Sequence, residues 1–157
     1  MEKIASFTVD HENLLSGLYV SRKDTHDGVT ITTFDLRLTA PNREAPLGTG
    51  VMHTIEHIGA TYLRSSGSGK DVVYFGPMGC RTGFYLLMFG DLRSADVLPL
   101  VRSAFGFIAE YEGDIPGASP SECGNWSDQD LDGAKVAAAR YLSDLAEPRL
   151  EYPGSCK

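Results

Sequence analysis

A chain of 157 residues is long enough to bury a core of its own, and we expect one domain over residues 1–157. Its 42% hydrophobic and 22% charged residues are typical of a globular protein, while the net charge of -7 argues against a basic, nucleic-acid-binding surface. No apolar run is long enough to span a membrane and residues 1–15 show no signal-peptide pattern, so we expect a cytoplasmic protein with no nucleic-acid or membrane partner.

The predicted elements include both strands and helices. Strands are predicted at four segments, most of them rich in β-branched and aromatic residues: 17–24, 28–38, 71–76 and 83–89. Helices are predicted at three segments with apolar residues at helical spacing: 50–65, 94–112 and 131–145. The order β-β-α-β-β-α-α predicts an α+β fold, a mostly antiparallel sheet with helices packed on one face (an α/β sandwich).

The helix predicted over 50–65 carries two histidines and a glutamate. His53 and His57 are spaced i and i+4, so on a helix their side chains lie about 5–6 Å apart on one face. That spacing lets two imidazoles bind one tetrahedral ion, and Glu56 completes the H-x-x-E-H pattern of inverted zincins. The alternative is a pair of ordinary helix histidines beside a solvated carboxylate. We favour a metal site because both histidines stand at ligand spacing on an otherwise apolar helix.

Three cysteines are too few and too scattered for a disulfide framework, and we interpret them as thiols. Cys123 lies in a loop between two predicted helices and is our candidate for a third ligand, the alternative being a small buried apolar residue. A His-His-Cys set accepts zinc, iron(II) or cobalt(II). Cys80 lies in a glycine-rich loop beside Arg81, and a nearby cation would lower the pKa of its thiol. The alternative is that Cys80 is a turn cysteine without a role. Cys156 is predicted to be a bystander near the terminus.

Five short blocks occur in a fixed order along the chain. They are SFTVDH (6–11), ITTFDLRLTAPN (31–42), HTIEH (53–57), MGCRTGFY (78–85) and ECGN (122–125). Together they resemble the LuxS family of S-ribosylhomocysteine lyases. The resemblance implies a homodimeric carbon–sulfur lyase with its active sites at the subunit interface. It also implies thioether cleavage to homocysteine and dihydroxypentanedione, the precursor of the quorum-sensing signal autoinducer-2.

The resemblance also implies the cofactor and the site residues. The reaction is expected to proceed by metal-assisted enolisation and β-elimination, with one divalent ion per subunit, typically Fe2+ with Zn2+ or Co2+ as substitutes. The family's metal ligands are matched by His53, His57 and Cys123. Its two acid–base residues are matched by Cys80 and Glu56. Its substrate-pocket residues are matched by Ser6, His11 and Arg37, the first two supplied by the neighbouring subunit.

The chain departs from the family pattern at two places. Tyr74, Phe75 and Gly76 stand where many members have Asp-Ile-Ser, whose aspartate helps to hold the amino-acid end of the substrate. Gln129 stands where many members have a histidine. Neither departure alters a matched ligand or acid–base residue, so the reaction class is expected to survive while contacts with the homocysteine end change.

Two other functions are compatible with the residues. One is an inverted-zincin metallopeptidase, whose third ligand would be a glutamate such as Glu122. The other is a non-catalytic zinc module that binds protein, in which Cys80 would serve as a fourth ligand and close the site.

Overall fold

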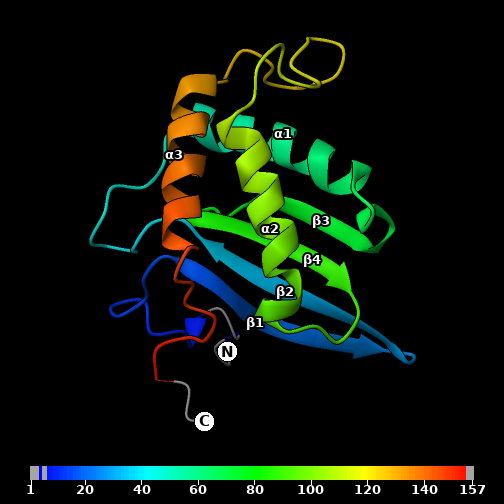
Figure 1. The fold of residues 1–157 in the computed structure, drawn as a ribbon, viewed down its shortest axis with the longest axis vertical. Coiled ribbons are helices and arrows are strands. Elements are labelled where there is room, and N and C mark those ends of the chain that lie inside the picture. Colours follow the sequence, from blue (N-terminus) through cyan, green and yellow to red (C-terminus); the bar gives the residue numbers. More distant parts are fainter. Residues whose placement is uncertain (1–3, 5–6, 155–157) are drawn as a thin grey trace.

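The computed structural model describes residue 4 and residues 7–154, and it has two layers, a sheet and a set of helices (Figure 1). The strands are β1 (Gly17–His26), β2 (Val29–Arg37), β3 (Val72–Pro77) and β4 (Gly83–Phe89). The helices are α1 (Thr49–Ser65), α2 (Ser94–Ala109) and α3 (Leu131–Asp144), with a short 3-10 turn η2 (Gly69–Asp71) after α1. The strands are all antiparallel, in the order β1-β2-β4-β3, which confirms the predicted α+β fold.

Two element boundaries differ from the prediction by more than one residue, for local reasons. β1 continues to His26, because Asp27 and Gly28 have φ values of 48° and 79° and form the tight turn that joins β1 to β2. α2 ends at Ala109 rather than at residue 112. The chain leaves the helix there and passes through Gly113 at a φ of 108°, which no helical residue adopts.

The helices cover one face of the sheet (Figure 1). Side chains alternate along a strand, so Phe34 and Leu36 of β2 and Phe84 and Leu86 of β4 share this face, and all four are buried. They belong to one apolar cluster with helix residues that include Ile55, Ile58, Val101, Phe105, Ala138 and Tyr141. This shared core fixes α1 against the sheet. Of the helices in the described part of the chain, none is long and apolar enough to cross a membrane.

The other face of the sheet, here called the open sheet face, carries none of the described helices (Figure 1). Its apolar and aromatic side chains include Ile31, Tyr74, Tyr85, Leu87 and Phe89. Tyr74 and Phe89 are 48% and 46% exposed, unusually open for large side chains on a sheet. The segment that precedes β1 passes over this face, since Ile4 and His11 line cavities together with its strand residues.

Candidate active site

One turn of α1 presents two imidazoles to the loop between α2 and α3. The rings of His53 and His57 lie edge to face with their centroids 4.6 Å apart. Cys123 of the loop places its Sγ 3.4 Å from Nε2 of His53. The candidate ligand atoms of all three side chains lie within 4.8 Å of one another, and each side chain is half-buried. We call these three residues the metal cluster.

Backbone carbonyls orient both imidazoles. Nδ1 of His53 donates to the Asp128 carbonyl at 2.9 Å, and Nδ1 of His57 donates to the Pro116 carbonyl at 2.6 Å. A proton on Nδ1 leaves Nε2 with its lone pair, the form that binds a cation. The donor set therefore suits a metal ion, because two imidazoles and a sulfur converge on one point.

Contacts with α1 hold the loop that carries Cys123. Gly117 has a φ of 68°, and a Cβ there would lie 3.3 Å from Nδ1 of His57, so glycine allows the loop to approach the ring closely. The hydroxyl of Thr54 donates to the Gln129 side chain at 2.8 Å and accepts from the Asp130 amide at 2.9 Å. Gln129, one of the two departures from the family pattern, thus anchors the loop beside the metal cluster.

Two glutamates near the metal cluster differ in their contacts. Glu56 is half-buried on α1, and no described residue holds its carboxylate in a hydrogen bond or an ion pair. Glu122 is exposed, and its carboxylate accepts a hydrogen bond from the Ser119 hydroxyl at 2.6 Å. Glu56 is therefore free to act on a bound molecule, whereas Glu122 lies outside the set of converging ligand atoms in the described chain.

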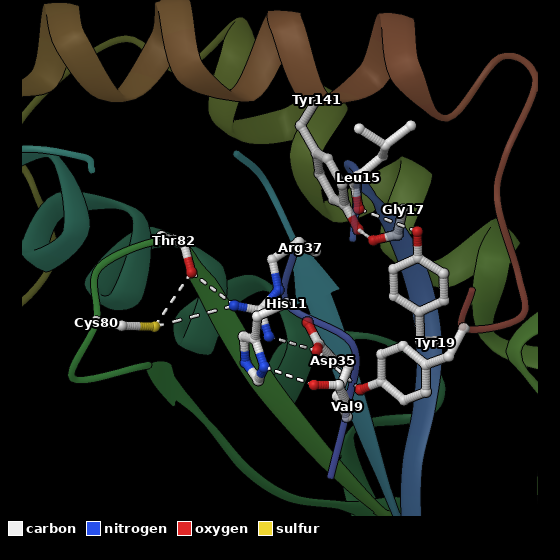
Figure 2. Close-up of polar contacts among 11 residues, drawn as sticks. Val9, His11, Leu15, Gly17, Tyr19, Asp35, Arg37, Cys80, Thr82 and Tyr141 are labelled. Carbon is white, nitrogen blue, oxygen red and sulfur yellow. Dashed lines mark hydrogen bonds and ion pairs between the residues drawn. The ribbon is translucent and has the colours of Figure 1, made fainter. Parts of the chain in front are cut away.

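A second polar group surrounds Cys80, at the turn between β3 and β4 (Figure 2). Its Sγ lies 3.1 Å from the Thr82 hydroxyl and 3.9 Å from Nη1 of Arg37, and Nη1 also donates to Thr82 at 2.6 Å. Nη2 of Arg37 donates to Asp35 at 2.6 Å, in a pair whose side chains are 4% and 2% exposed. We call Cys80, Thr82, Arg37 and Asp35 the thiol cluster.

The contacts of Cys80 favour its thiolate form. Partial burial acts to raise the pKa of Cys80, but hydrogen bonds from Thr82 and the positive charge of Arg37 outweigh it. The net effect is a thiol pKa below its ordinary value. Burial acts to lower the pKa of Arg37, but Asp35, with smaller contributions from Cys80 and Tyr152, outweighs it and raises the pKa, so the guanidinium stays charged.

The cation beside Cys80 is not the one that the sequence analysis considered. Arg81 has a φ of 57° and donates to the Leu47 carbonyl at 3.2 Å. The charge comes instead from Arg37, at the far end of β2, which the sequence analysis assigned only to the substrate pocket. The alternation of side chains along β2 would have placed Arg37 beside Asp35 on one face, but no local pattern links it to Cys80.

A cavity of about 250 Å3 lies beside the thiol cluster and is lined by His11, Arg37 and Cys80 (Figure 2). His11 is held there by a hydrogen bond from its Nδ1 to the Val9 carbonyl at 2.9 Å. Ser6, the third residue assigned to the substrate pocket, lies outside the described residues, as does Cys156. The structure thus gathers the predicted site residues that it describes into two groups, the metal cluster with Glu56 next to His57 on α1, and this cavity.

No hydrogen bond or ion pair among the described side chains joins the metal cluster to the thiol cluster. Backbone contacts connect them indirectly, because the Leu47 amide donates to the Arg81 carbonyl at 2.9 Å just before α1 begins. The turn that carries Cys80 is therefore fixed against the start of the helix that carries His53.

The departure at residues 74–76 has a steric explanation. The ring of Tyr74 lies over Gly76, where a Cβ would come within 2.0 Å of the Tyr74 hydroxyl. Tyr74 also lines a cavity of about 300 Å3 with Tyr85 and Leu87, next to the cavity of the thiol cluster. A side chain at position 76 would therefore require the end of the Tyr74 side chain to move.

The chain is similar to known proteins over nearly its whole length. A family model described as S-ribosylhomocysteinase (LuxS) matches residues 4–151. The S-ribosylhomocysteine lyase of Clostridium acetobutylicum is 52% identical over 157 residues, covering 98% of this chain and 99% of the relative. That of Phocaeicola vulgatus is 54% identical over 158 residues, covering 98% of each. The sequence blocks, the geometry and these matches agree: the chain belongs to the LuxS family of S-ribosylhomocysteinases.

Proposed function

We propose that this chain is a carbon–sulfur lyase that cleaves S-ribosylhomocysteine to homocysteine and dihydroxypentanedione. The observation that carries the proposal is the convergence of His53, His57 and Cys123, in a chain whose relatives at 52% and 54% identity are named S-ribosylhomocysteine lyase. His53, His57 and Cys123 would hold the ion with three protein ligands, fewer than a closed structural site uses, so the site would remain open to substrate. We also propose that the chain forms a single domain and that the protein is cytoplasmic. Its product dihydroxypentanedione would be the precursor of autoinducer-2.

The donor set supports a divalent transition metal. Two imidazoles and a thiolate suit Fe2+, Zn2+ and Co2+, and we propose Fe2+, one ion per subunit, as the resemblance implies. His53, His57 and Cys123 would hold it. When bound, the ion supplies Lewis acidity that polarises the substrate carbonyl and acidifies the neighbouring C–H bond.

Cys80 and Glu56 are proposed to move the protons. The Cys80 thiolate removes a proton from the carbon next to the carbonyl and returns it to the adjacent carbon, so that the carbonyl migrates along the sugar chain. Glu56, whose carboxylate no described residue engages, exchanges protons with the sugar hydroxyls. In the final step a proton leaves carbon, a C=C bond forms, and the C–S bond breaks with its electron pair on sulfur. Protonation of that sulfur releases homocysteine.

The open sheet face supports a homodimer with the active sites at its interface. Tyr74, Leu87 and Phe89 expose apolar surface there, and two such faces would bury it against each other. His11 lies against the same face, in the cavity with Cys80. Within one chain His11 lines a cavity with its own Cys80, so the assignment of Ser6 and His11 to the partner's substrate pocket requires the N-terminal segment to reach across this interface.

A charge on the open sheet face should separate the two copies. We expect Leu87→Glu to sediment as a monomer and to lose lyase activity, because a buried, unpaired carboxylate opposes association. Val136→Glu is the matched control, since Val136 is 71% exposed on α3 and should tolerate the charge. Analytical ultracentrifugation measures both. A Leu87→Glu protein that sediments like the unsubstituted chain would exclude this face as the interface.

The alternative functions receive less support from the geometry. A peptidase site would use a glutamate as third ligand, but the carboxylate of Glu122 bonds to Ser119 instead. A closed structural site would need Cys80 as fourth ligand, but the Cys80 thiol contacts Thr82 and is not among the converging ligand atoms of the described residues. The metal cluster instead has three protein ligands, which suits a site that admits a substrate.

The test is to incubate the reduced, metal-loaded protein with S-ribosylhomocysteine and titrate the released thiol. We expect one thiol per substrate consumed, and no release by a Cys123→Ser variant. Absence of thiol from the metal-loaded wild-type protein would reject the proposal. Metal loss in Glu122→Gln with retention in Cys123→Ser would favour the peptidase instead.

A further inference from the structure

The chain returns to the sheet after α3 and lies along β1. The Arg149 carbonyl accepts from the Leu18 amide at 2.9 Å, and the Leu150 carbonyl accepts from the Ser94 hydroxyl at 3.2 Å. These bonds bring Tyr152 onto Tyr19, with the two rings stacked at a centroid distance of 4.7 Å and an interplanar angle of 17°. The C-terminal segment thus has a defined position, and Tyr152 lines the cavity of the thiol cluster.

The Tyr152 hydroxyl donates to Oδ2 of Asp35 at 2.8 Å. The same oxygen accepts from Nη2 of Arg37 at 2.6 Å, while Oδ1 of Asp35 and Nε of Arg37 are buried and find no hydrogen-bond partner among the described residues. Asp35 therefore holds the guanidinium through one oxygen only, and Tyr152 holds that oxygen. Burial and the Asp35 charge raise the pKa of Tyr152, so the phenol keeps the proton that it donates.

We propose that Tyr152 is a positioning residue for the Cys80 thiol. It acts through the buried pair of Asp35 and Arg37, whose Nη1 reaches both the thiol and the hydroxyl beside it. With the phenol in place, the carboxylate engages the guanidinium from one side and leaves Nη1 directed at Cys80. Without it, the carboxylate is free to rotate, pair with Nε through its unused oxygen, and draw the guanidinium away from the thiol.

Several ionisable groups face the thiol, and the test must separate their effects. Arg37 and Asp35 come from β2, Tyr85 from β4, His11 from the N-terminal segment and Tyr152 from the C-terminal segment. Of these, only Tyr152 is changed in the test. Loss of its hydroxyl should weaken the Arg37 contact, raise the pKa of Cys80 and reduce its thiolate fraction near neutral pH by about threefold for each half unit of pKa.

The experiment compares Tyr152→Phe with Tyr19→Phe in the full-length, metal-loaded protein. Each variant keeps its aromatic ring, and each removes one phenol hydroxyl from the same stack. The Tyr19 hydroxyl donates to the Leu15 carbonyl at 3.0 Å and makes no hydrogen bond with the thiol cluster in the described part of the chain. The rate of Cys80 alkylation by iodoacetamide is followed from pH 6 to 10 by mass spectrometry of the Cys80 peptide, and Tm is recorded alongside.

We expect the alkylation profile of Tyr152→Phe to move to higher pH, with that of Tyr19→Phe unchanged. A profile like that of the wild type, or an equal shift in both variants, would overturn the proposal. The catalytic use of this positioning rests on the proposed function of Cys80, but alkylation does not require lyase activity. A shifted profile in a protein that releases no homocysteine would therefore reject the proposed function and keep the positioning role.

Discussion

The metal cluster and the thiol cluster are built in opposite ways. Two of the three ligands in the metal cluster stand one turn apart on α1, and neutral backbone carbonyls orient them. The thiol cluster has no such local unit. Cys80 obtains its cation from Arg37, which stands on a different strand and depends in turn on Asp35.

The two clusters are therefore suited to different tasks, the first to cation binding and the second to proton transfer. Dipoles of the backbone hold the imidazoles without adding charge, so the metal cluster is ready to take up a cation. The thiol cluster carries a formal ion pair, buried with side chains 4% and 2% exposed, and its charges act on the protonation of a sulfur. A change in one region should therefore alter metal binding, and a change in the other should alter proton transfer.

The strongest test of this comparison substitutes each of the two cysteines separately. Cys123→Ser should lower metal affinity by about 100-fold or more, because loss of a ligand exceeds the usual effect of losing an outer-shell contact. Lyase activity should disappear with the metal. Metal content is measured by elemental analysis after dialysis, and activity by thiol release.

Cys80→Ser should show the opposite pattern. Metal content should stay at the wild-type level, while the rate of thiol release should fall by about 10²–10⁴-fold, the usual contribution of a general acid or base. Metal loss from Cys80→Ser would show that the two clusters are not separable. Full activity with metal bound would remove Cys80 from the proposed mechanism.

The sequence predicted the metal cluster better than the thiol cluster for a physical reason. The spacing of His53 and His57 is a property of a helix and is visible within one turn. The position of Arg37 beside Cys80 depends on the register of β2 against β4, in which Arg37 pairs with Gly83. A sheet register of this kind is set by long-range packing. The resemblance to the LuxS family supplied the assignment of Arg37 that the residue pattern could not.

Much of the fold was also predictable, since strand and helix patterns are local. The strand Gly83–Phe89 was predicted with its correct bounds, and the hairpin of β1 and β2 differed at its turn and by one residue at the end of β2. The path of the chain after α3 was not predicted. Nothing in the sequence around Tyr152 indicates that its hydroxyl reaches Asp35, because that contact requires the C-terminal segment to return to β1.

A smaller effect is expected from Thr82→Val, which removes one hydrogen bond from the thiol. The hydroxyl and the backbone of Thr82 each form a hydrogen bond that lowers the pKa of Cys80, and loss of the hydroxyl bond alone should raise that pKa. The thiolate then forms only at higher pH, and the pH profile of Cys80 alkylation should move upward. At neutral pH we expect about a tenfold loss of thiol reactivity for each unit of pKa, with metal content unchanged.

Thr39→Val is the matched control for this variant. Thr39 is buried as well, and its hydroxyl bonds to none of the residues that the structure describes, so the same substitution there removes no described bond. Both residues lie close together, since the Thr39 amide donates to the Thr82 carbonyl at 3.1 Å. An equal shift of the alkylation profile in both variants would mean that packing, rather than the hydroxyl of Thr82, sets the reactivity of Cys80.

The smallest expected effect concerns the loop that orients His57. Gly117→Ala places a Cβ 3.3 Å from Nδ1 of His57 at a φ of 68°, whereas Gly113→Ala adds a Cβ with no atom within 4 Å at a φ of 108°. Both variants should lose about 1 kcal/mol or more of stability, because alanine is strained at positive φ. Only Gly117→Ala should also displace the carbonyl that holds the imidazole and weaken metal binding, by up to about tenfold. Thermal unfolding and a competitive metal titration measure the two effects separately. Equal metal affinity in the two variants would show that the loop does not orient His57. The metal cluster would then not be oriented by backbone carbonyls, as its contrast with the thiol cluster requires.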